Sequence, residues 1–176
     1  MRRGLATRDI GLIAVLTALT VVFTLLIRIP TPARGYINLS DVAITFTGLA
    51  FGPWYGMIVG GLGTGLADLI GGYAAFAPLS LLAHGAEGLL IGLIGGGSRS
   101  IPRMIGAWAA GAAAMVGIYL VGEGLFYTGW PLAIAEVPAN IFQAAVGALV
   151  GIPLVIAVRR AYPRLDQIGR PPTWIE

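Results

Sequence analysis

The sequence contains no cysteine, no lysine and a single histidine, His84. Without cysteine the chain has no disulfide, no thiolate metal site and no cysteine nucleophile. A single histidine excludes the paired-histidine signature of metalloproteases. The absence of lysine excludes both a Walker A loop and a Schiff base, so ATP hydrolysis that drives this protein would occur on another subunit.

Charged residues are also scarce. They make up 11% of the 176 residues, whereas 57% are apolar and the mean hydropathy is +0.85. A soluble domain carries roughly 25% charged residues, so this composition is typical of an integral membrane protein. Because one crossing needs about 20 residues, the chain has room for one domain with about five or six crossings.

Six apolar segments alternate with short loops rich in glycine, proline or arginine. They predict helices over about 10–29, 42–51, 55–70, 79–94, 104–127 and 132–158. The first segment is long enough to span a bilayer, and we expect it to remain uncleaved because it does not fit a secretory signal. The second and third segments are short, so they form either two tilted helices or one re-entrant hairpin.

The arginines indicate an orientation. Six crossings place both termini on one side, and if that side is cytoplasmic the inside segments carry nine arginines and the outside segments two. The inside set is Arg2, Arg3, Arg8, Arg99, Arg103, Arg159, Arg160, Arg164 and Arg170, and the outside set is Arg28 and Arg34. This bias follows the positive-inside rule, so the pI near 9.7 requires no nucleic-acid partner.

The prediction is therefore an all-α integral membrane protein, a compact six-transmembrane-helix bundle with both termini cytoplasmic. Residues 1–162 form a single substrate-binding domain, and residues 163–176 form a cytoplasmic polar tail. We expect a multi-pass protein of the cell membrane.

Polar side chains of five separate segments fall at the same outer depth, while the inner half carries almost none. Polar groups inside a membrane span are costly and mark functional sites. Glu136, Asn140 and Gln143 share one helix stripe, and His84 and Glu87 are three residues apart. We predict a polar cavity that opens outward and is closed below by apolar packing. Its candidate residues are Asn38, Asp68, His84, Glu87, Tyr119, Glu123, Tyr127, Glu136, Asn140 and Gln143.

Several candidates also fit structural roles. Ser40 or Asp41 can cap the second helix. Asp68 can be a solvated helix end, and His84 can be hydrogen-bonded inside the bundle without touching a ligand. A set of aromatic residues fits either an interfacial belt or a surface that stacks on a flat ligand: Tyr36, Tyr73, Phe126, Tyr127 and Trp130.

Small residues recur four positions apart and allow helices to approach closely. We expect most of the glycine pairs to serve internal packing; they are Gly56/Gly60, Gly61/Gly65, Gly88/Gly92 and Gly147/Gly151. Ala14 and Ala18 lie on the first helix with no polar neighbour, which favours a flat docking surface for another membrane protein.

Three segments occur in order: Gly35-Tyr-Ile-Asn-Leu-Ser-Asp41, Phe51-Gly-Pro-Trp-Tyr-Gly56 and Ala67-Asp-Leu-Ile-Gly-Gly-Tyr73. With the Ala14-Val-Leu-Thr-Ala18 element, they resemble the S components of energy-coupling-factor (ECF) vitamin transporters. The resemblance covers about residues 10–160. It is to the branch that includes riboflavin, hydroxymethylpyrimidine and pyridoxine S components.

The resemblance implies a binding subunit that captures a vitamin from outside and is not an enzyme. It also implies a transmembrane T component, which contacts the Ala14 and Ala18 face, and two cytoplasmic ATPases. The S component of this family is thought to topple in the membrane to release its ligand inward. We expect no cofactor and no metal.

The candidate residues are rich in carboxylate and amide acceptors, which suit a neutral or cationic ligand with N–H and O–H donors. Hydroxymethylpyrimidine, pyridoxine or a thiamine-like heterocycle fits better than folate, pantothenate or biotin, and riboflavin stays open. The nearest counter-charge for an anionic ligand is Arg34. A solitary proton-coupled transporter using Glu87, Glu123 or Glu136 is the alternative, and an intramembrane enzyme has no supporting motif.

Overall fold

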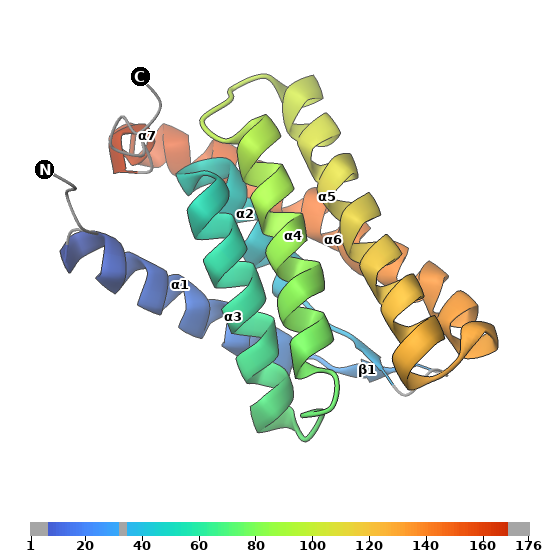
Figure 1. The fold of residues 1–176 in the computed structure, drawn as a ribbon. Coiled ribbons are helices and arrows are strands. Elements are labelled where there is room, and N and C mark those ends of the chain that lie inside the picture. The colour runs from blue at the N-terminus through green and yellow to red at the C-terminus, as the bar shows by residue number, and fades with distance from the viewer. Residues whose placement is uncertain (1–6, 32–34, 169–176) are drawn as a thin grey trace, which may run out of the picture.

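The structure, a computed structural model, describes residues 7–31 and 35–168, most of which are helical (Figure 1). The helices are α1 (Thr7–Leu26), α2 (Ser40–Phe51), α3 (Pro53–Gly71), α4 (Ala77–Gly95), α5 (Ile101–Gly122), the π-helical turn η1 (Glu123–Tyr127), α6 (Trp130–Ala161) and α7 (Leu165–Ile168). Strands β1 (Ile29–Pro30) and β2 (Tyr36–Ile37) pair antiparallel between α1 and α2. The predicted helical bundle is thus confirmed, with one short hairpin in addition.

The six predicted segments correspond to α1 to α6. Within the described part of the chain, four helical stretches are long and apolar enough to cross a membrane: α1, α4, residues 101–127 and α6. The 12-residue α2 is shorter, at about 18 Å. The glycine-rich α3 has 19 residues but is not among the four. Helices long and apolar enough to span a membrane are therefore confirmed, whereas six full crossings and the position of both termini remain predictions.

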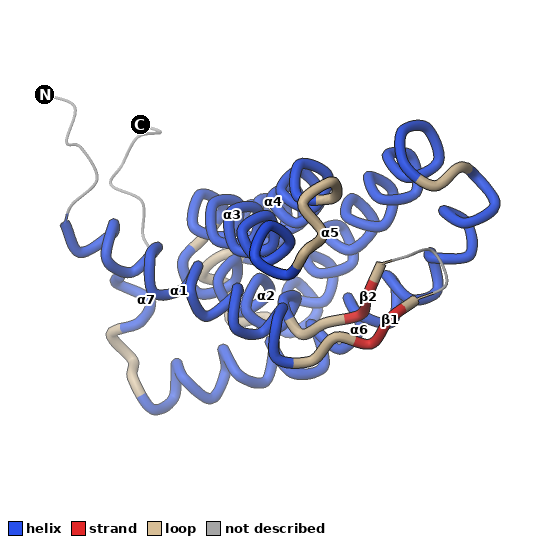
Figure 2. Tube along the Cα trace, turned by 90° about the horizontal axis from the view of Figure 1, so that it is seen from below, coloured by secondary structure: helices blue, strands red, loops and turns tan. Residues whose placement is uncertain are grey.

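The short helix α2 lies at the centre of the bundle. It packs against α1, α3, α4 and α6, and every one of its residues except Phe46 is buried. Figure 2 shows α2 with α3 and α4 on one side and α6 on the other. At Gly52 the backbone takes a φ of 89°, which favours glycine, and Pro53 then begins α3. The second and third segments thus form two helices joined by a tight turn.

Glycines let the central helices touch. A Cβ atom added at Gly88 of α4 would lie 2.1 Å from the carbonyl oxygen of Gly56 in α3. One added at Gly60 would lie 2.5 Å from the carbonyl oxygen of His84. In α6, Gly147 packs in the same way against Asp41 of α2. The predicted packing role of these glycines is confirmed.

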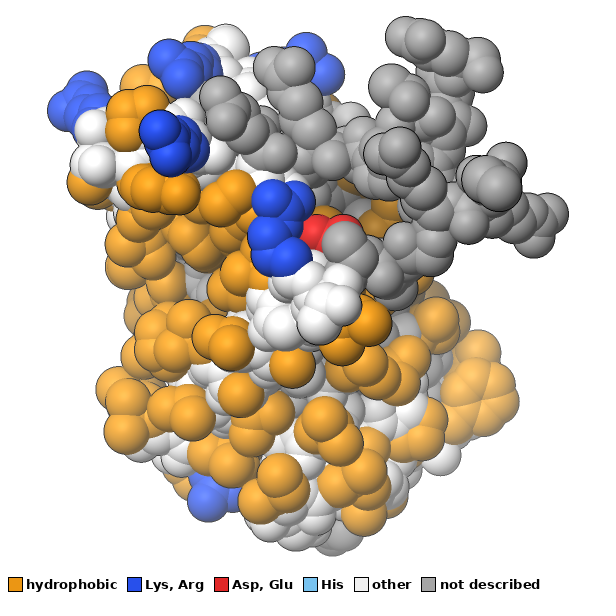
Figure 3. Space-filling view, turned by 90° about the vertical axis from the view of Figure 1, so that its left-hand side faces the viewer, with side chains coloured by type: hydrophobic (Ala, Val, Ile, Leu, Met, Phe, Trp, Pro, Cys, Tyr) orange, Lys and Arg blue, Asp and Glu red, His pale blue; other side chains and the backbone are white. Residues whose placement is uncertain are grey.

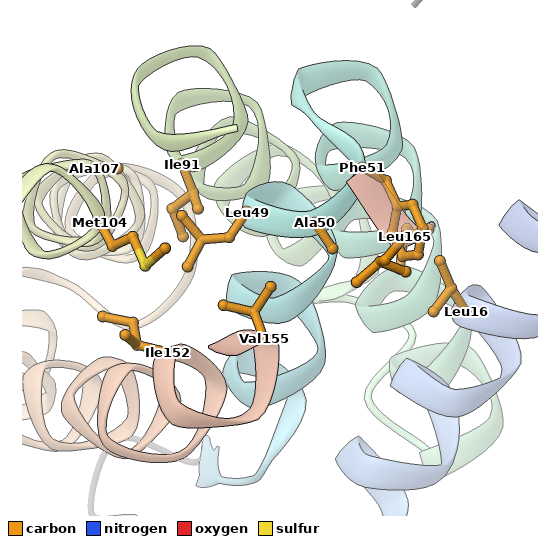
Figure 4. Close-up of a cluster of buried hydrophobic side chains, with 11 residues drawn as sticks. Leu16, Leu49, Ala50, Phe51, Ile91, Met104, Ala107, Ile152, Val155 and Leu165 are labelled. Carbon is orange, nitrogen blue, oxygen red and sulfur yellow. The ribbon is translucent and has the colours of Figure 1, made fainter. Parts of the chain in front are cut away.

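The largest apolar core lies around the C-terminal end of α2 (Figure 4). Leu49, Ile91 and Val155 are fully buried there, and α7 adds Leu165 to the same cluster. The buried Arg159 donates hydrogen bonds to the carbonyl oxygens of Ser98 (2.5 Å) and Leu49 (2.8 Å). These bonds tie α6 to α2 and to the α4–α5 connection.

The first turn of α1 and the helix α7 lie at the same end of the bundle (Figure 1). Figure 3 shows a belt of hydrophobic side chains with several basic groups toward one end and a further one at the opposite end. Of the arginines that indicated orientation, Arg2, Arg3, Arg34 and Arg170 lie outside the described residues. Within the predicted tail the structure describes residues 163–168, and its boundary at residue 163 stays a prediction.

Candidate functional site

A polar cavity lies in the half of the bundle away from the α2–α3 turn. Side chains from α1, the β2 region, α3, α4, α5, η1 and α6 line it, so nearly every long element contributes. The lining residues are Thr24, Gly35, Tyr36, Asn38, Thr64, Asp68, Tyr73, Phe76, Ser80, His84, Tyr119, Glu123, Glu136, Asn140 and Gln143.

Asp68 of α3 is held on both carboxylate oxygens. The Tyr36 hydroxyl donates to Oδ1 at 2.6 Å, and the Ser80 hydroxyl donates to Oδ2 at 2.5 Å. The Tyr119 hydroxyl in turn donates to the Ser80 hydroxyl at 2.7 Å. Burial and the bond to Asp68 raise the pKa of Tyr36 above its usual range, so this residue stays a donor. The chain of bonds links the β2 region to α3, α4 and α5 across the cavity.

A second network lies where α2 begins. The Gln143 side chain of α6 donates to Asp41 Oδ1 at 3.1 Å and accepts a hydrogen bond from the Asn38 backbone at 2.9 Å. Ser40 also donates to Asp41 Oδ1, at 3.1 Å, and its backbone donates to the Asn38 side chain. The N-cap residue of α2 is Leu39, without a side-chain cap, so neither Ser40 nor Asp41 caps the helix, and Asp41 is bound to α6.

His84 connects Asp41 to Glu87 beneath the cavity. Its Nδ1 atom lies 2.9 Å from Glu87 Oε2 and 3.5 Å from Asp41 Oδ1, and all three side chains are buried. One donor atom from each lies within 4.8 Å of the others, so the three could hold one small cation. A proton shared between His84 and Glu87 suits the same geometry, because it neutralises charge that burial makes costly.

Glu123 and Glu136 face the cavity from η1 and the start of α6. Each side chain is only 4% exposed, and each has one buried carboxylate oxygen without a partner among the described residues. Glu136 Oε1 also lies close to the backbone of Gly35 in the β-hairpin. Each of these two carboxylates therefore keeps an oxygen that can accept a hydrogen bond, whereas both oxygens of Asp68 already accept one.

Aromatic side chains of the β2 region and the α3–α4 connection form part of the lining. The rings of Tyr36 and Tyr73 are 4.7 Å apart, and Phe76 stacks on Tyr127 at 5.0 Å. Arg28 donates to the Gly71 carbonyl oxygen at 3.2 Å and lies over the Tyr36 ring. Flat apolar faces beside polar groups suit a heterocyclic ring.

The cavity volume is about 40 Å³. That is room for a few waters at about 10 to 15 Å³ each by this measure. A ring-sized ligand therefore requires lining side chains to move apart. The unpartnered Glu123 and Glu136 side chains make no hydrogen bond with the described residues that would oppose such a movement.

The structure brings eight of the ten predicted site residues to this cavity: Asn38, Asp68, His84, Tyr119, Glu123, Glu136, Asn140 and Gln143. Glu87 lies deeper than predicted. It is the eleventh of 19 residues in α4, past the middle of the helix, and it reaches the cavity only through His84. Tyr127 lies outside the lining and contacts it through Phe76.

Three further lining residues, Thr24, Thr64 and Phe76, carried no predicted role. The hydroxyls of Thr24 and Thr64 donate to backbone carbonyls one turn earlier in their helices, a usual threonine bond that carries no site signal. Phe76 lies in a short loop next to Tyr73, in a segment already rich in aromatic residues. These neighbouring aromatic residues were the sequence signal that could have identified Phe76 as a lining residue.

Ala14 and Ala18 are both exposed on α1. The same helix exposes Val15, Leu19 and Val22, whereas Leu16 and Thr20 face the bundle. The exposed surface of α1 is therefore small and apolar, as the sequence predicted; its role as a partner interface remains a prediction.

Comparison with known proteins agrees with this architecture. The family described as "ECF-type riboflavin transporter, S component" matches residues 4–160. The chain is 34% identical to the thiamine precursor transporter HmpT of Lactococcus lactis subsp. cremoris over 142 residues, which covers 80% of this chain and 81% of that protein. It is 37% identical to an uncharacterized protein of Pyrococcus woesei over 132 residues, which covers 74% and 87%. The chain thus belongs to the ECF-type riboflavin transporter S component family, whose members are membrane transport subunits.

Proposed function

We propose that this chain is the substrate-binding subunit of an ATP-driven ECF-type importer. It captures a small heterocyclic vitamin or vitamin precursor in its polar cavity and delivers it inward with a T component and two ATPases. The observation that carries the proposal is the position of the cavity: polar groups from seven elements converge in one half of the bundle, and an apolar core fills the other.

The proposal places the cavity on the outer side of the cell membrane and both termini in the cytoplasm. Arg99 and Arg103 lie at the α4–α5 connection, and Arg159 and Arg160 lie at the end of α6, at the other end of the helices from the cavity. Arg28 lies near the cavity mouth. The positive-inside rule supports this orientation.

The proposed ligand is neutral or cationic. The lining offers carboxylate, amide and hydroxyl groups, and within the described residues no arginine lines it. Hydroxymethylpyrimidine, pyridoxine and thiamine-like compounds provide the N–H and O–H donors that such a lining requires, and riboflavin is a less favoured ligand. Similarity to a protein named as a thiamine precursor transporter supports a pyrimidine compound among these ligands.

The proposed contact with the T component uses the exposed small face of α1 around Ala14 and Ala18. Small residues allow close helix approach in a membrane, where burial of apolar surface against lipid supplies little driving force. A leucine at either position would separate the two helices without disturbing the cavity, because both side chains point away from the bundle.

The test separates ligand binding from uptake. The purified chain alone is expected to bind one of these heterocycles, and proteoliposomes are expected to accumulate it only when the T component, both ATPases and ATP are present. Ala14→Leu is expected to reduce uptake at least about 10-fold and to leave binding unchanged, whereas Asn140→Ala is expected to weaken binding.

Two outcomes would contradict this function. Accumulation by the chain alone, driven by a pH gradient and abolished by an uncoupler, would instead favour a proton-coupled transporter. Loss of ligand binding in Ala14→Leu with assembly intact would reverse the proposed division between cavity and α1. Gly106→Leu is the control, because Gly106 is likewise exposed with open space around it but lies on α5, away from the Ala14 and Ala18 face.

A further inference from the structure

The buried acids around the cavity differ in how their oxygens are used. Both oxygens of Asp68 accept hydrogen bonds, and one oxygen each of Asp41 and Glu87 does so. Among the residues that the structure describes, Glu123 and Glu136 have no side-chain hydrogen bond and no ion pair. Two carboxylates that line a cavity, are nine-tenths buried and have no partner among the described residues require a proton, a hydrogen-bond donor or a cation that these residues do not supply.

Both carboxylates line the same cavity, Glu123 from η1 and Glu136 from α6. Like charges at short range in a poorly solvated site destabilise each other unless a proton or a cation neutralises one of them. Asn140 lies one turn after Glu136 on the same stripe of α6 and also lines the cavity. The two carboxylates and the amide therefore line the cavity from η1 and α6.

The π-helical turn η1 determines where Glu123 points. Such turns are rare and occur often at functional sites. The backbone amides of Thr128 and Gly129 both donate to the Glu123 carbonyl oxygen, at 2.9 and 3.1 Å, and close the turn. Gly124 packs against Trp130, where an added Cβ would lie 2.7 Å from the indole ring. A side chain at position 124 would therefore force η1 and the Trp130 ring apart.

We propose that Glu123 and Glu136 are the specificity-determining pair that binds the N–H-bearing, positively charged edge of the heterocycle, with Gly124 as a positioning residue. This inference rests on the proposed transport function and deepens it. A protonated aminopyrimidine presents a ring N–H beside an exocyclic amino group, and one carboxylate accepts these two donors in parallel. The second carboxylate accepts the remaining amino or hydroxyl donor. Asp68 holds the lining together and does not select the ligand.

The experiment uses the purified full chain in detergent and three probes. They are hydroxymethylpyrimidine, its analogue in which oxygen replaces the exocyclic amino group, and riboflavin. Titration calorimetry of the unaltered chain is expected to favour the aminopyrimidine over the oxo analogue by at least about 10-fold. Glu123→Gln and Glu136→Gln are each expected to weaken aminopyrimidine binding by about 10- to 100-fold, the range for a lost charge-assisted hydrogen bond. Binding of the oxo analogue should change by less than about 3-fold.

Two glycine variants test the positioning role. Gly124→Ala is expected to lower the preference for the amino group, because the added methyl group separates η1 from the Trp130 ring and loosens the position of Glu123. Gly117→Ala, one to two turns earlier on α5, meets no atom within 4 Å and is the matched control. The thermal midpoint of each variant, measured in the same detergent, shows whether it is folded. If Gly124→Ala does not fold, the two glutamine variants alone decide the proposal, since they preserve side-chain shape.

Each outcome of the binding experiment decides the role of the Glu123 and Glu136 pair, the proposed function, or both. A preference for the amino group that is unchanged in both glutamine variants would overturn the inference. Binding of riboflavin with no binding of the aminopyrimidine would also overturn it, while the transport function would stand. If the chain binds none of the three probes and no other heterocycle, the proposed function fails as well. Loss of the amino preference in both variants, with oxo binding retained, supports the inference.

Discussion

At the end of the bundle that holds the α2–α3 turn, helices touch through glycine and the space between them is filled by Leu49, Ile91 and Val155. At the other end the same helices surround a cavity lined by polar groups, two of which have unpartnered carboxylate oxygens. One end is thus built for packing, and the other keeps hydrogen-bonding capacity for a ligand. Variants at the two ends should therefore have different consequences.

The end that holds the α2–α3 turn, the closed end, depends most on the contact between α3 and α4. Gly88→Ala is expected to lower the free energy of unfolding by about 3 kcal/mol, because its methyl group would overlap the Gly56 carbonyl and force the helices apart. Chemical unfolding of the purified chain in mixed micelles measures the difference. Gly106→Ala is the control in open space on α5. Equal stability of the two variants would mean that the α3–α4 contact does not support the closed end.

Arg159 provides the next largest effect at this end. Arg159→Ala is expected to cost about 2 kcal/mol, because the Ser98 carbonyl loses its arginine donor and buried side-chain packing is lost. The Leu49 carbonyl keeps the backbone amide of Gly97 as a donor, which limits the loss. The same unfolding measurement serves, with the exposed Arg160→Ala as the control, expected to lie within about 0.5 kcal/mol of the unaltered chain. A neutral Arg159→Ala would contradict a structural role for these bonds.

The contrast between the two ends was largely readable from the sequence. Apolar segment lengths predicted the helices, and the depth of scattered acids and amides predicted the cavity. The depth argument worked for Glu136, Asn140 and Gln143 because they share one stripe of a regular helix. It failed for Glu87, because helix α4 begins at Ala77, two residues earlier than expected, which places Glu87 deeper in the bundle. Glu87 therefore hydrogen-bonds to the lining residue His84 and does not line the cavity itself.

Other features could not be read from residue patterns. The central position of α2 depends on contacts with four other helices, and its sequence alone is compatible with a short membrane-surface segment. The π-helical turn at Glu123 depends on the fit of Gly124 against Trp130, a contact across the α5–α6 connection. The pairing of β1 with β2 involves only two residues in each strand, too few to leave a periodic signal.

At the cavity end, Glu136 is expected to show the smallest stability effect, and one of opposite sign. Glu136→Leu should raise the free energy of unfolding by about 1 kcal/mol, because an unpartnered buried carboxyl is replaced by an apolar group of similar size. Asp68→Leu, whose carboxylate accepts two hydrogen bonds, should instead lower it by about 2 kcal/mol. Unfolding of both variants without ligand tests the difference. If Glu136→Leu destabilises the chain as much as Asp68→Leu, the two acids have the same structural role. The idea that the cavity end gives up stability to keep an acceptor for a ligand would then be wrong.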